Sequence, residues 1–332
     1  MGRAFLRVSS LTSVGLIVVF VVGCGNAGGN SAPAGLEKTT LTVGAVPVAD
    51  EAGLYIAENQ GLFRDEGLDV RINSIVSSAV ATQDQNNGTY DITAGNSVSY
   101  IQDQVSGRSN LEIVAEGSLM QPNNQALYTL PGSPLRSITD LGHARIGVNV
   151  TNNIGTLLIS SVLEEHGVSL SGVKFVAVKT GFPGMARALQ RHAIDAAWLP
   201  EPFGSADAAS MGLAELCDLN QGATLGFPVG WYVVTKAWAK KYPRTLAAFL
   251  DALRQGQQIA DSQRTAVEQA MEKLPSPYAV PPVIASVMSL ETYPLNVAPD
   301  IDRSRVQRVA NEMYQFQMLQ QPFQVSSMLG GL

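Results

Sequence analysis

Strand-like and helix-like segments alternate along the first third of the chain, and this alternation restricts the possible folds more than any other feature of the sequence. Residues 40–46 contain alternating β-branched residues and end at Pro47, and residues 68–75 form a second strand-like segment. A segment of helical character follows each of them, at residues 54–63 and 79–87. Strands that alternate with helices of about a dozen residues form parallel βαβ units, so the sequence predicts an α/β fold with open sheets.

The same order of elements occurs a second time further along the chain. In the first copy Asp91 lies 24 residues after Gly67, and in the second copy Asp195 lies 28 residues after Gly167. Each aspartate precedes a short strand at the end of a run of strand, helix, strand and helix. Any two βαβ units share some similarity, which is the alternative interpretation. We interpret the repeat as two similar α/β lobes that face each other across a cleft.

The chain is expected to cross twice between these lobes. Residues 126–130 are predicted to be the strand that leaves the first lobe, and residues 231–234 the strand that returns to it. The predicted first lobe therefore comprises residues 40–130 and 235–332, and the predicted second lobe comprises residues 131–234. Two crossings form a two-strand hinge, and the helical C-terminal segments are expected to pack on the first lobe.

The length and composition of the chain agree with two globular lobes. The chain has 332 residues, which is enough for two domains, and 45% of them are apolar. With 22 Lys and Arg against 28 Asp and Glu, the formal net charge is −6. No basic stripe stands out, so we expect no nucleic-acid partner, and we expect the protein to be a monomer.

The N-terminal segment has the pattern of a secretory signal. Arg3 and Arg7 precede an apolar run at residues 14–22, which is too short to span a bilayer. The sequence that ends at Cys24 resembles the lipobox of bacterial lipoproteins, in which the cysteine thiol is acylated. We therefore predict a lipoprotein signal peptide at residues 1–23, a lipid anchor on Cys24 and a flexible tether at residues 24–39. An uncleaved membrane anchor, or a cysteine that stands at this position by chance, is the alternative.

Several segments in the expected order resemble one family of transport proteins. They are residues 43–47, 54–70, 138–141, 194–198 and 201–203. These segments are similar to substrate-binding lipoproteins of ABC importers, in the nitrate/sulfonate/taurine and thiamine-pyrimidine-precursor (SsuA/THI5-like) group. The sequence departs from the family at Gly142-His143, where the family usually has glycine and lysine, and at His192, where it usually has glycine.

The resemblance implies a type II periplasmic-binding fold, whose two α/β lobes close on a small molecule. It also implies delivery of that molecule to an ABC permease with its ATPase. The expected location is the bacterial cell envelope, either lipid-anchored at the outer face of the cytoplasmic membrane or periplasmic.

The loops that follow the strands form the predicted ligand site, because small molecules bind beyond the carboxyl ends of strands in open α/β sheets. These loops comprise residues 46–51, 77–78, 95–97, 149–156, 180–182 and 198–203. The candidate ligand-binding residues, which are mostly small, polar or aromatic, are Asp50, Tyr55, Ser77, Ser78, Asn96, Ser97, Asn152, Asn153, Gly155, Thr156, Phe182, Trp198, Glu201 and Trp231.

Two ligand chemistries remain open on the sequence alone. The helix that starts near residues 151–156 could hold an anion such as a sulfonate at its N-terminus, although ordinary N-capping explains most such sequences. The predicted loops contain almost no cations, and Lys179 is adjacent to them. Aromatic residues such as Phe182 and Trp198 would suit a pyrimidine-like heterocycle, although core packing is their alternative role. Glu201 could accept a hydrogen bond from an amine.

Enzymatic functions lack support in the sequence. His143, His166 and His192 are widely separated, and no catalytic triad motif or phosphate-binding loop occurs. We expect no enzyme activity, no catalytic residues, no cofactor and no metal. A pyrimidine-precursor synthase of the same fold is one alternative, but it resembles an intracellular protein with a cysteine cluster. A surface sensor without a permease is the other. Cys217 is predicted to be a small buried residue.

Overall fold

The structure is a computed structural model, and it describes residues 35–330. The predicted signal peptide, Cys24 and most of the predicted tether lie outside the described residues. From Leu36 onward the chain forms a single unit by its internal contacts. Within the described part of the chain, none of the helices is both long enough and apolar enough to cross a bilayer.

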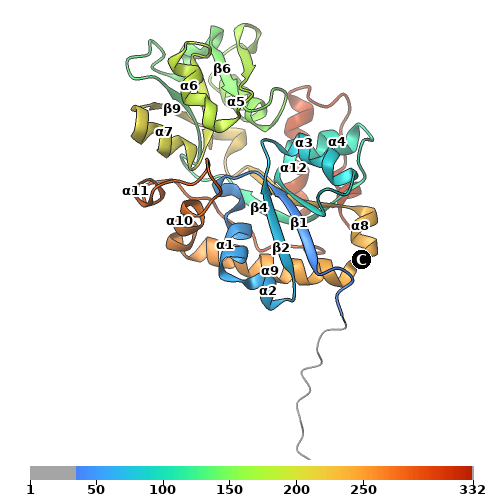
Figure 1. Ribbon diagram of the computed structural model, residues 1–332. Coiled ribbons are helices and arrows are strands. Elements are labelled where there is room, and N and C mark those ends of the chain that lie inside the picture. Colours follow the sequence, from blue (N-terminus) through green and yellow to red (C-terminus); the bar gives the residue numbers. More distant parts are fainter. Residues whose placement is uncertain (1–34, 331–332) are drawn as a thin grey trace, which may run out of the picture. The chain divides into compact units, whose positions relative to one another are not determined.

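Two five-stranded sheets of the same design organise the unit (Figure 1). The first sheet has the order β2-β1-β3-β10-β4, and the second has the order β7-β6-β8-β5-β9. The strands of the first sheet are β1 (Thr40–Ala45), β2 (Asp69–Ser74), β3 (Ile92–Asn96), β4 (Leu111–Leu119) and β10 (Pro228–Thr235). Those of the second are β5 (Gln125–Thr129), β6 (Arg145–Val148), β7 (Lys174–Ala177), β8 (Ala196–Pro200) and β9 (Ala214–Asp218).

Each sheet combines three parallel strands with antiparallel ones. In the first sheet β1 pairs in parallel with β2 and β3, and in the second β6 pairs in parallel with β7 and β8. The strand that enters each sheet from the other lobe, β10 or β5, pairs antiparallel with its neighbours. The repeated arrangement confirms the predicted α/β fold of two similar lobes.

The structure assigns the two crossing strands to other lobes than the sequence-based boundaries do. The prediction placed residues 126–130 in the first lobe and residues 231–234 in the second. In the structure β5 lies between β8 and β9, and β10 lies between β3 and β4. Each crossing strand thus belongs to the lobe that it enters, since its buried backbone groups are satisfied by strands on both sides. The sheet-to-sheet connections are therefore residues 120–124 and 219–227.

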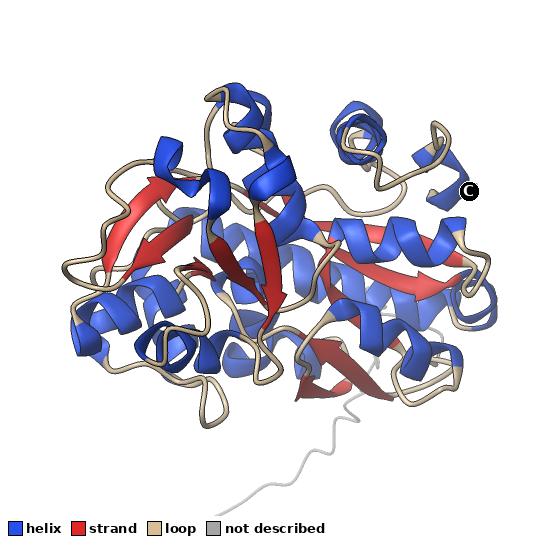
Figure 2. Cartoon of the chain, turned by 90° about the horizontal axis from the view of Figure 1, so that it is seen from above, coloured by secondary structure: helices blue, strands red, loops and turns tan. Residues whose placement is uncertain are grey.

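Helices pack around both sets of strands (Figure 2). In the first lobe they are α1 (Ala52–Gln60), α2 (Leu62–Asp65), α3 (Ser78–Asn86), α4 (Ser97–Val105), α8 (Lys236–Lys241), α9 (Pro243–Ser262), α10 (Arg264–Glu272), α11 (Pro282–Ala285) and α12 (Arg303–Gln315). In the second lobe they are α5 (Ile154–Glu165), α6 (Met185–Gln190) and α7 (Phe203–Met211). The long helix α9 lies along α1 and α2, and the ring of Phe249 in α9 stacks on that of Phe63 in α2 at 5.0 Å. This contact places the C-terminal helices on the first sheet's lobe.

Short 3₁₀ helices occupy several turns between these elements. They are η1 (Ala49–Glu51), η2 (Ile138–His143), η3 (Leu170–Gly172), η4 (Phe182–Gly184), η5 (Gly222–Thr224) and η6 (Val325–Met328). Cys217 in β9 is partly buried, and its thiol donates to the carbonyl of Asp218 at 3.2 Å. Burial raises the pKa of this thiol to about 11, so it remains protonated at neutral pH.

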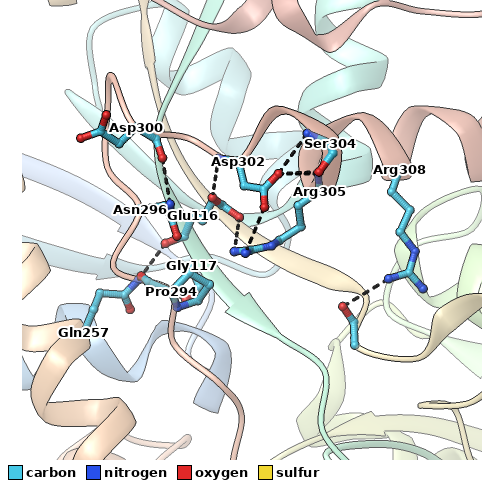
Figure 3. A network of polar contacts seen from close by, with 11 residues as sticks. Glu116, Gly117, Gln257, Pro294, Asn296, Asp300, Asp302, Ser304, Arg305 and Arg308 are labelled. Atoms are coloured by element: carbon cyan, nitrogen blue, oxygen red, sulfur yellow. Dashed lines mark hydrogen bonds and ion pairs between the residues drawn. The ribbon is translucent and has the colours of Figure 1, made fainter.

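A polar network fixes the C-terminal segment to the first sheet (Figure 3). The buried carboxylate of Glu116 in β4 accepts hydrogen bonds from the backbone N–H of Asp302 at 3.0 Å and from Arg305 at 2.9 Å. Asp302 in turn caps α12 by accepting from the backbone N–H of Ser304 and Arg305. The guanidinium of Arg308 donates to the carbonyl of Leu225 at 2.9 Å. Helix α12 therefore holds both β4 and the connection that precedes β10.

Candidate functional site

A cavity lies where the carboxyl ends of the parallel strands of the two lobes meet. The space between atoms at this site amounts to about 370 Å³ with open solvent included, and the centre of a water molecule can occupy about 30 Å³ of it, so the cavity is narrow. The first lobe lines it with Val46, Val48, Asp50, Glu51, Gly95, Asn96, Val229 and Gly230. The second lobe lines it with Gln125, Asn149, Ile154, Phe182, Trp198 and Pro200. Because both lobes contribute, the cavity is a cleft of the kind that open α/β sheets form at their strand ends.

An aromatic wall forms the second-lobe side of the cavity. The rings of Phe182 and Trp198 meet edge-to-face at 5.3 Å, and Phe203 packs behind Phe182 at 5.4 Å. Gln125 holds the indole of Trp198, whose Nε1 donates to Gln125 Oε1 at 3.1 Å. A β-carbon at Gly155 would overlap the indole ring, so the close approach of α5 to this ring requires glycine. These contacts give the wall one fixed geometry.

Two adjacent acidic residues form the first-lobe side of the cavity. Asp50 and Glu51 lie in η1, directly after the carboxyl end of β1. The Asp50 carboxylate accepts hydrogen bonds from Ser118 Oγ at 3.1 Å and from Gln125 Nε2 at 3.3 Å. Glu51 is 0% exposed, and neither of its carboxylate oxygens has a hydrogen-bond partner among the described residues. Such an unsatisfied buried carboxyl is costly, and it is the least compensated group of the site.

Burial perturbs the titration of this acidic group. It raises the pKa of Asp50 to about 6, although hydrogen bonds partly offset this effect. Burial, together with the charge of Asp50, raises the pKa of Glu51 well above its ordinary value. The same two causes raise the pKa of Glu291, a buried residue whose Oε1 accepts from Asn124 Nδ2 at 2.8 Å. Hydrogen-bond donors or positive charge would stabilise these carboxylates, and a bound anion would be repelled by them.

Hydrogen bonds between the lobes flank the cavity. Asn153 Nδ2 donates to Ser99 Oγ at 2.9 Å, and Gln102 Nε2 donates to the carbonyl of Asn152 at 2.8 Å. The backbone N–H of Ala49 donates to the carbonyl of Glu201 at 2.9 Å. The lobes therefore touch around the site, as in a closed state of a two-lobed binding protein.

Four of the predicted ligand-binding residues line the cavity. They are Asp50, Asn96, Phe182 and Trp198. Two others support them, since Ser78 Oγ accepts from the backbone N–H of Asn96 at 2.9 Å and Gly155 adjoins Trp198.

The other predicted residues lie outside the lining of this cavity, and ligand contact by them stays a prediction. Asn153 and Thr156 form a capping box at the start of α5. The carboxylate of Glu201 accepts from the hydroxyl and the backbone N–H of Ser205. Trp231 is fully buried within β10. The remaining four residues are Tyr55, Ser77, Ser97 and Asn152.

Sequence reasoning missed important cavity residues. Gln125 directly precedes the strand predicted at residues 126–130 and was not among the candidates, and only its pairing opposite Pro200 brings it to the cavity. Glu51 was within a predicted loop but was not selected, although its position beside Asp50 was a usable signal. Gly230 approaches the site only because β10 enters the first sheet beside Asn96 and Ser118.

Comparison with known proteins identifies the family. The family model described as "NMT1/THI5 like" matches residues 48–264, which is well over half of the chain. The chain belongs to the NMT1/THI5-like family. No curated protein sequence matches the chain significantly.

Solved structures of similar fold confirm the two-lobed architecture. The alkanesulfonate-binding protein SsuA from Xanthomonas axonopodis pv. citri, bound to MOPS, has a TM-score of 0.73 at 16% identity, covering 89% of this chain and 99% of that one. The periplasmic nitrate-binding protein NrtA from Synechocystis PCC 6803 has a TM-score of 0.72 at 15% identity, covering 88% and 85%. The desulfurization enzyme DSZB has a TM-score of 0.66 at 14% identity, covering 88% and 96%. These likenesses establish the periplasmic-binding-protein fold alone, since the fold carries both binding proteins and an enzyme.

The raised carboxyl pKa values predict how stability depends on pH. A folded state that binds protons more tightly than the unfolded chain is most stable in acid, and it loses this advantage as pH rises through the raised pKa values. For Asp50 that interval runs from 3.8 to about 6, and for Glu51 it extends further. We expect the unfolding free energy of the ligand-free chain to decrease from about pH 4 to about pH 6 as Asp50 loses its proton, and to decrease further above that range as Glu51 does.

Urea unfolding across this pH range tests the prediction. Glu51→Gln removes one titrating carboxyl and should flatten the decrease, whereas Glu164→Gln, at an exposed position of α5, should leave it unchanged. If Glu51→Gln kept the wild-type pH dependence, Glu51 would not carry the raised pKa.

Proposed function

We propose that this protein is the extracytoplasmic substrate-binding component of an ABC importer and that it captures a small polar molecule in the cavity between its lobes. The observation that carries this proposal is the cavity itself, which loops from the strand ends of both lobes enclose. Membership of the NMT1/THI5-like family supports it, as does the shared fold with sulfonate-binding and nitrate-binding proteins.

Hinge closure explains how such a cavity loads and unloads. Residues 120–124 and 219–227 are the two connections about which the lobes rotate. Closure brings the Trp198 wall over the Asp50 side, and the contact between Asn153 and Ser99 forms at the rim. A ligand that touches both lobes favours the closed state, because only that state offers both sets of contacts. The closed, liganded form then docks on the permease, whose ATPase drives release.

The cavity favours a pyrimidine-like heterocycle or an amine over a small sulfonate. The edge-to-face pair of Phe182 and Trp198 offers aromatic surface to a ring. Asp50 provides a carboxylate that accepts from N–H donors. Among the described residues that line the cavity there is no Lys or Arg, and these are the side chains that would compensate a bound anion.

A ligand screen tests the proposed function. We expect a thermal-shift screen of sulfonates, nitrate, taurine, pyrimidines and amines to yield a compound that stabilises the chain by about 2.7 kcal/mol at about a hundred times its Kd. Trp198→Ala should reduce the ligand-induced shift, measured relative to its own ligand-free melting temperature. Tyr314→Ala, at an exposed aromatic of α12, is the control and should retain the full shift.

The outcomes separate the competing functions. A surface sensor would also bind a ligand, but its gene would lie apart from genes for an ABC permease and ATPase. A pyrimidine-precursor synthase would convert its ligand, whereas a transport protein should release it chemically unchanged. Full retention of the shift in Trp198→Ala would contradict ligand binding at this cavity.

We also propose that Cys24 anchors the mature, monomeric protein to the membrane after removal of residues 1–23. The pattern of Arg3, Arg7 and the apolar run at residues 14–22 supports a signal peptide. Acyl chains on Cys24 would hold the protein near the permease at the outer face of the cytoplasmic membrane.

Membrane fractionation tests the anchor. Cys24→Ala removes the proposed attachment point, so the variant should leave the membrane pellet and appear in the soluble fraction. Cys217→Ala, which removes the second cysteine, is the matched control and should stay in the pellet. Retention of Cys24→Ala in the pellet would show that the N-terminal apolar run itself holds the protein in the membrane.

A further inference from the structure

Glu51 is the residue of the cavity whose chemistry is least explained by the protein itself. Its side chain is fully buried, and both carboxylate oxygens lack a hydrogen-bond partner within the described part of the chain. The neighbouring Asp50 is different, since Ser118 and Gln125 donate to it. Buried carboxylates in proteins normally have donors, so the two open acceptors of Glu51 indicate a partner that arrives with the ligand.

The position of Gly230 shows that Glu51 faces the cavity. Gly230 lines the same cavity from β10, and a β-carbon built on it would lie 3.6 Å from Glu51 Oε1 and 3.2 Å from Ser118 Oγ. The missing side chain therefore leaves space beside this oxygen. Since the backbone of Gly230 is outside the left-handed region, space rather than backbone conformation distinguishes glycine from alanine at this position.

The two carboxylate oxygens of Glu51 and the aromatic wall together indicate which chemical group of a ligand would fit the cavity. A carboxylate is matched by two N–H donors on one carbon, which form parallel charge-assisted hydrogen bonds in one plane. The Phe182 and Trp198 rings lie across the cavity and suit a planar group. A tetrahedral ammonium would satisfy the charge, but it would present its N–H bonds in different directions.

We propose that Glu51 is the specificity-determining residue of the cavity and that it binds a planar nitrogen cation with two N–H donors on one carbon, namely an amidinium or a guanidinium group. This inference rests on the proposed function, because it assigns a chemical class to the ligand of the same cavity. Asp50 adds negative charge beside Glu51 and orients Gln125, which holds the indole of Trp198.

Tyr232 offers the alternative role for Glu51. Its hydroxyl, on β10, is buried close to the Glu51 carboxylate, although no hydrogen bond of good geometry joins the two groups. Burial is the main cause of the raised pKa of Tyr232, and the charge of Glu51 and a weak hydrogen bond to it add to the shift. If the phenol of Tyr232 were the true partner, Glu51 would be structural. Glu51→Gln and Tyr232→Phe would then both change ligand-free stability, and neither would change the preference for a class of ligand.

Four probes that share one phenyl ring test the proposal. Benzamidine carries the planar donor pair, benzylamine carries a single ammonium, and benzoate and benzenesulfonate carry negative charge. We expect calorimetry near neutral pH to rank benzamidine above benzylamine and to detect no binding of the two anions. Glu51→Gln should weaken benzamidine by about tenfold to a hundredfold. Glu164→Gln, the exposed control, should leave its affinity unchanged.

A steric variant separates a role in binding from a role in folding. Gly230→Ala keeps the carboxylate but places a methyl group 3.6 Å from Glu51 Oε1, and 3.2 Å and 3.3 Å from the Oγ and the backbone N of Ser118, which must shift slightly. It should weaken benzamidine binding, and urea unfolding without ligand measures how much stability the shift of Ser118 costs. Tyr232→Phe should retain the preference for benzamidine over benzenesulfonate.

Three results would overturn the proposal. The first is unchanged benzamidine affinity in Glu51→Gln, and the second is binding of benzenesulfonate as tight as that of benzamidine. The third is absence of benzamidine binding at millimolar concentration. A different result would contradict the proposed function, namely that no compound of the wider screen binds in the cavity.

Discussion

Each strand that crosses between the lobes is inserted between two strands of the sheet that it enters, and this pairing determines the geometry of the cavity. The register of β5 sets Gln125 opposite Pro200, and the register of β10 sets Gly230 beside Asn96 and Ser118. The first residues of both crossing strands therefore lie at the cavity. Because an inserted strand cannot slip without losing its pairing on both sides, the connections can bend while the strand ends keep their positions.

The buried carboxyls give this geometry its chemical character. Burying the charges of Asp50, Glu51 and Glu291 in one region costs free energy, and the raised pKa values of the three groups express this cost. Hydrogen bonds offset it only in part. A ligand with N–H donors would compensate this cost at the moment of closure, and an anion would increase it. The fold is shared with a sulfonate-binding and a nitrate-binding protein at 16% and 15% identity, so the ligand class must be argued from the side chains.

The fold was predictable from the sequence because its signals are local. Alternating strand and helix patterns, such as residues 40–46 followed by residues 54–63, showed the α/β class, and the repeat around Asp91 and Asp195 showed two lobes. The sheet that each of β5 and β10 joins could not be predicted in the same way, because the sequence pattern of a buried strand does not specify which strands lie beside it.

The site was predictable where it follows directly from strand ends. Asp50, Asn96 and Trp198 lie in or beside loops after strands, and the structure places them at the cavity. Glu201 lies in such a loop as well, but Ser205 and Ser289 donate to its carboxylate, and the contact with Ser289 joins residues 88 positions apart. Gln125 and Gly230 reach the cavity through the crossing strands. Contacts of this kind depend on the topology of the fold and leave no local signal in the sequence.

The distance between the lobes in solution tests the central claim most directly. Spin labels at Val80→Cys in α3 and Arg187→Cys in α6, with Cys24 and Cys217 replaced by serine, would report on the two lobes, since both positions are exposed. Pulsed electron paramagnetic resonance should give a longer and broader distance distribution without ligand than with a ligand from the screen. A distribution that stayed unchanged at saturating ligand, with binding verified by calorimetry, would contradict closure of the two lobes over the ligand.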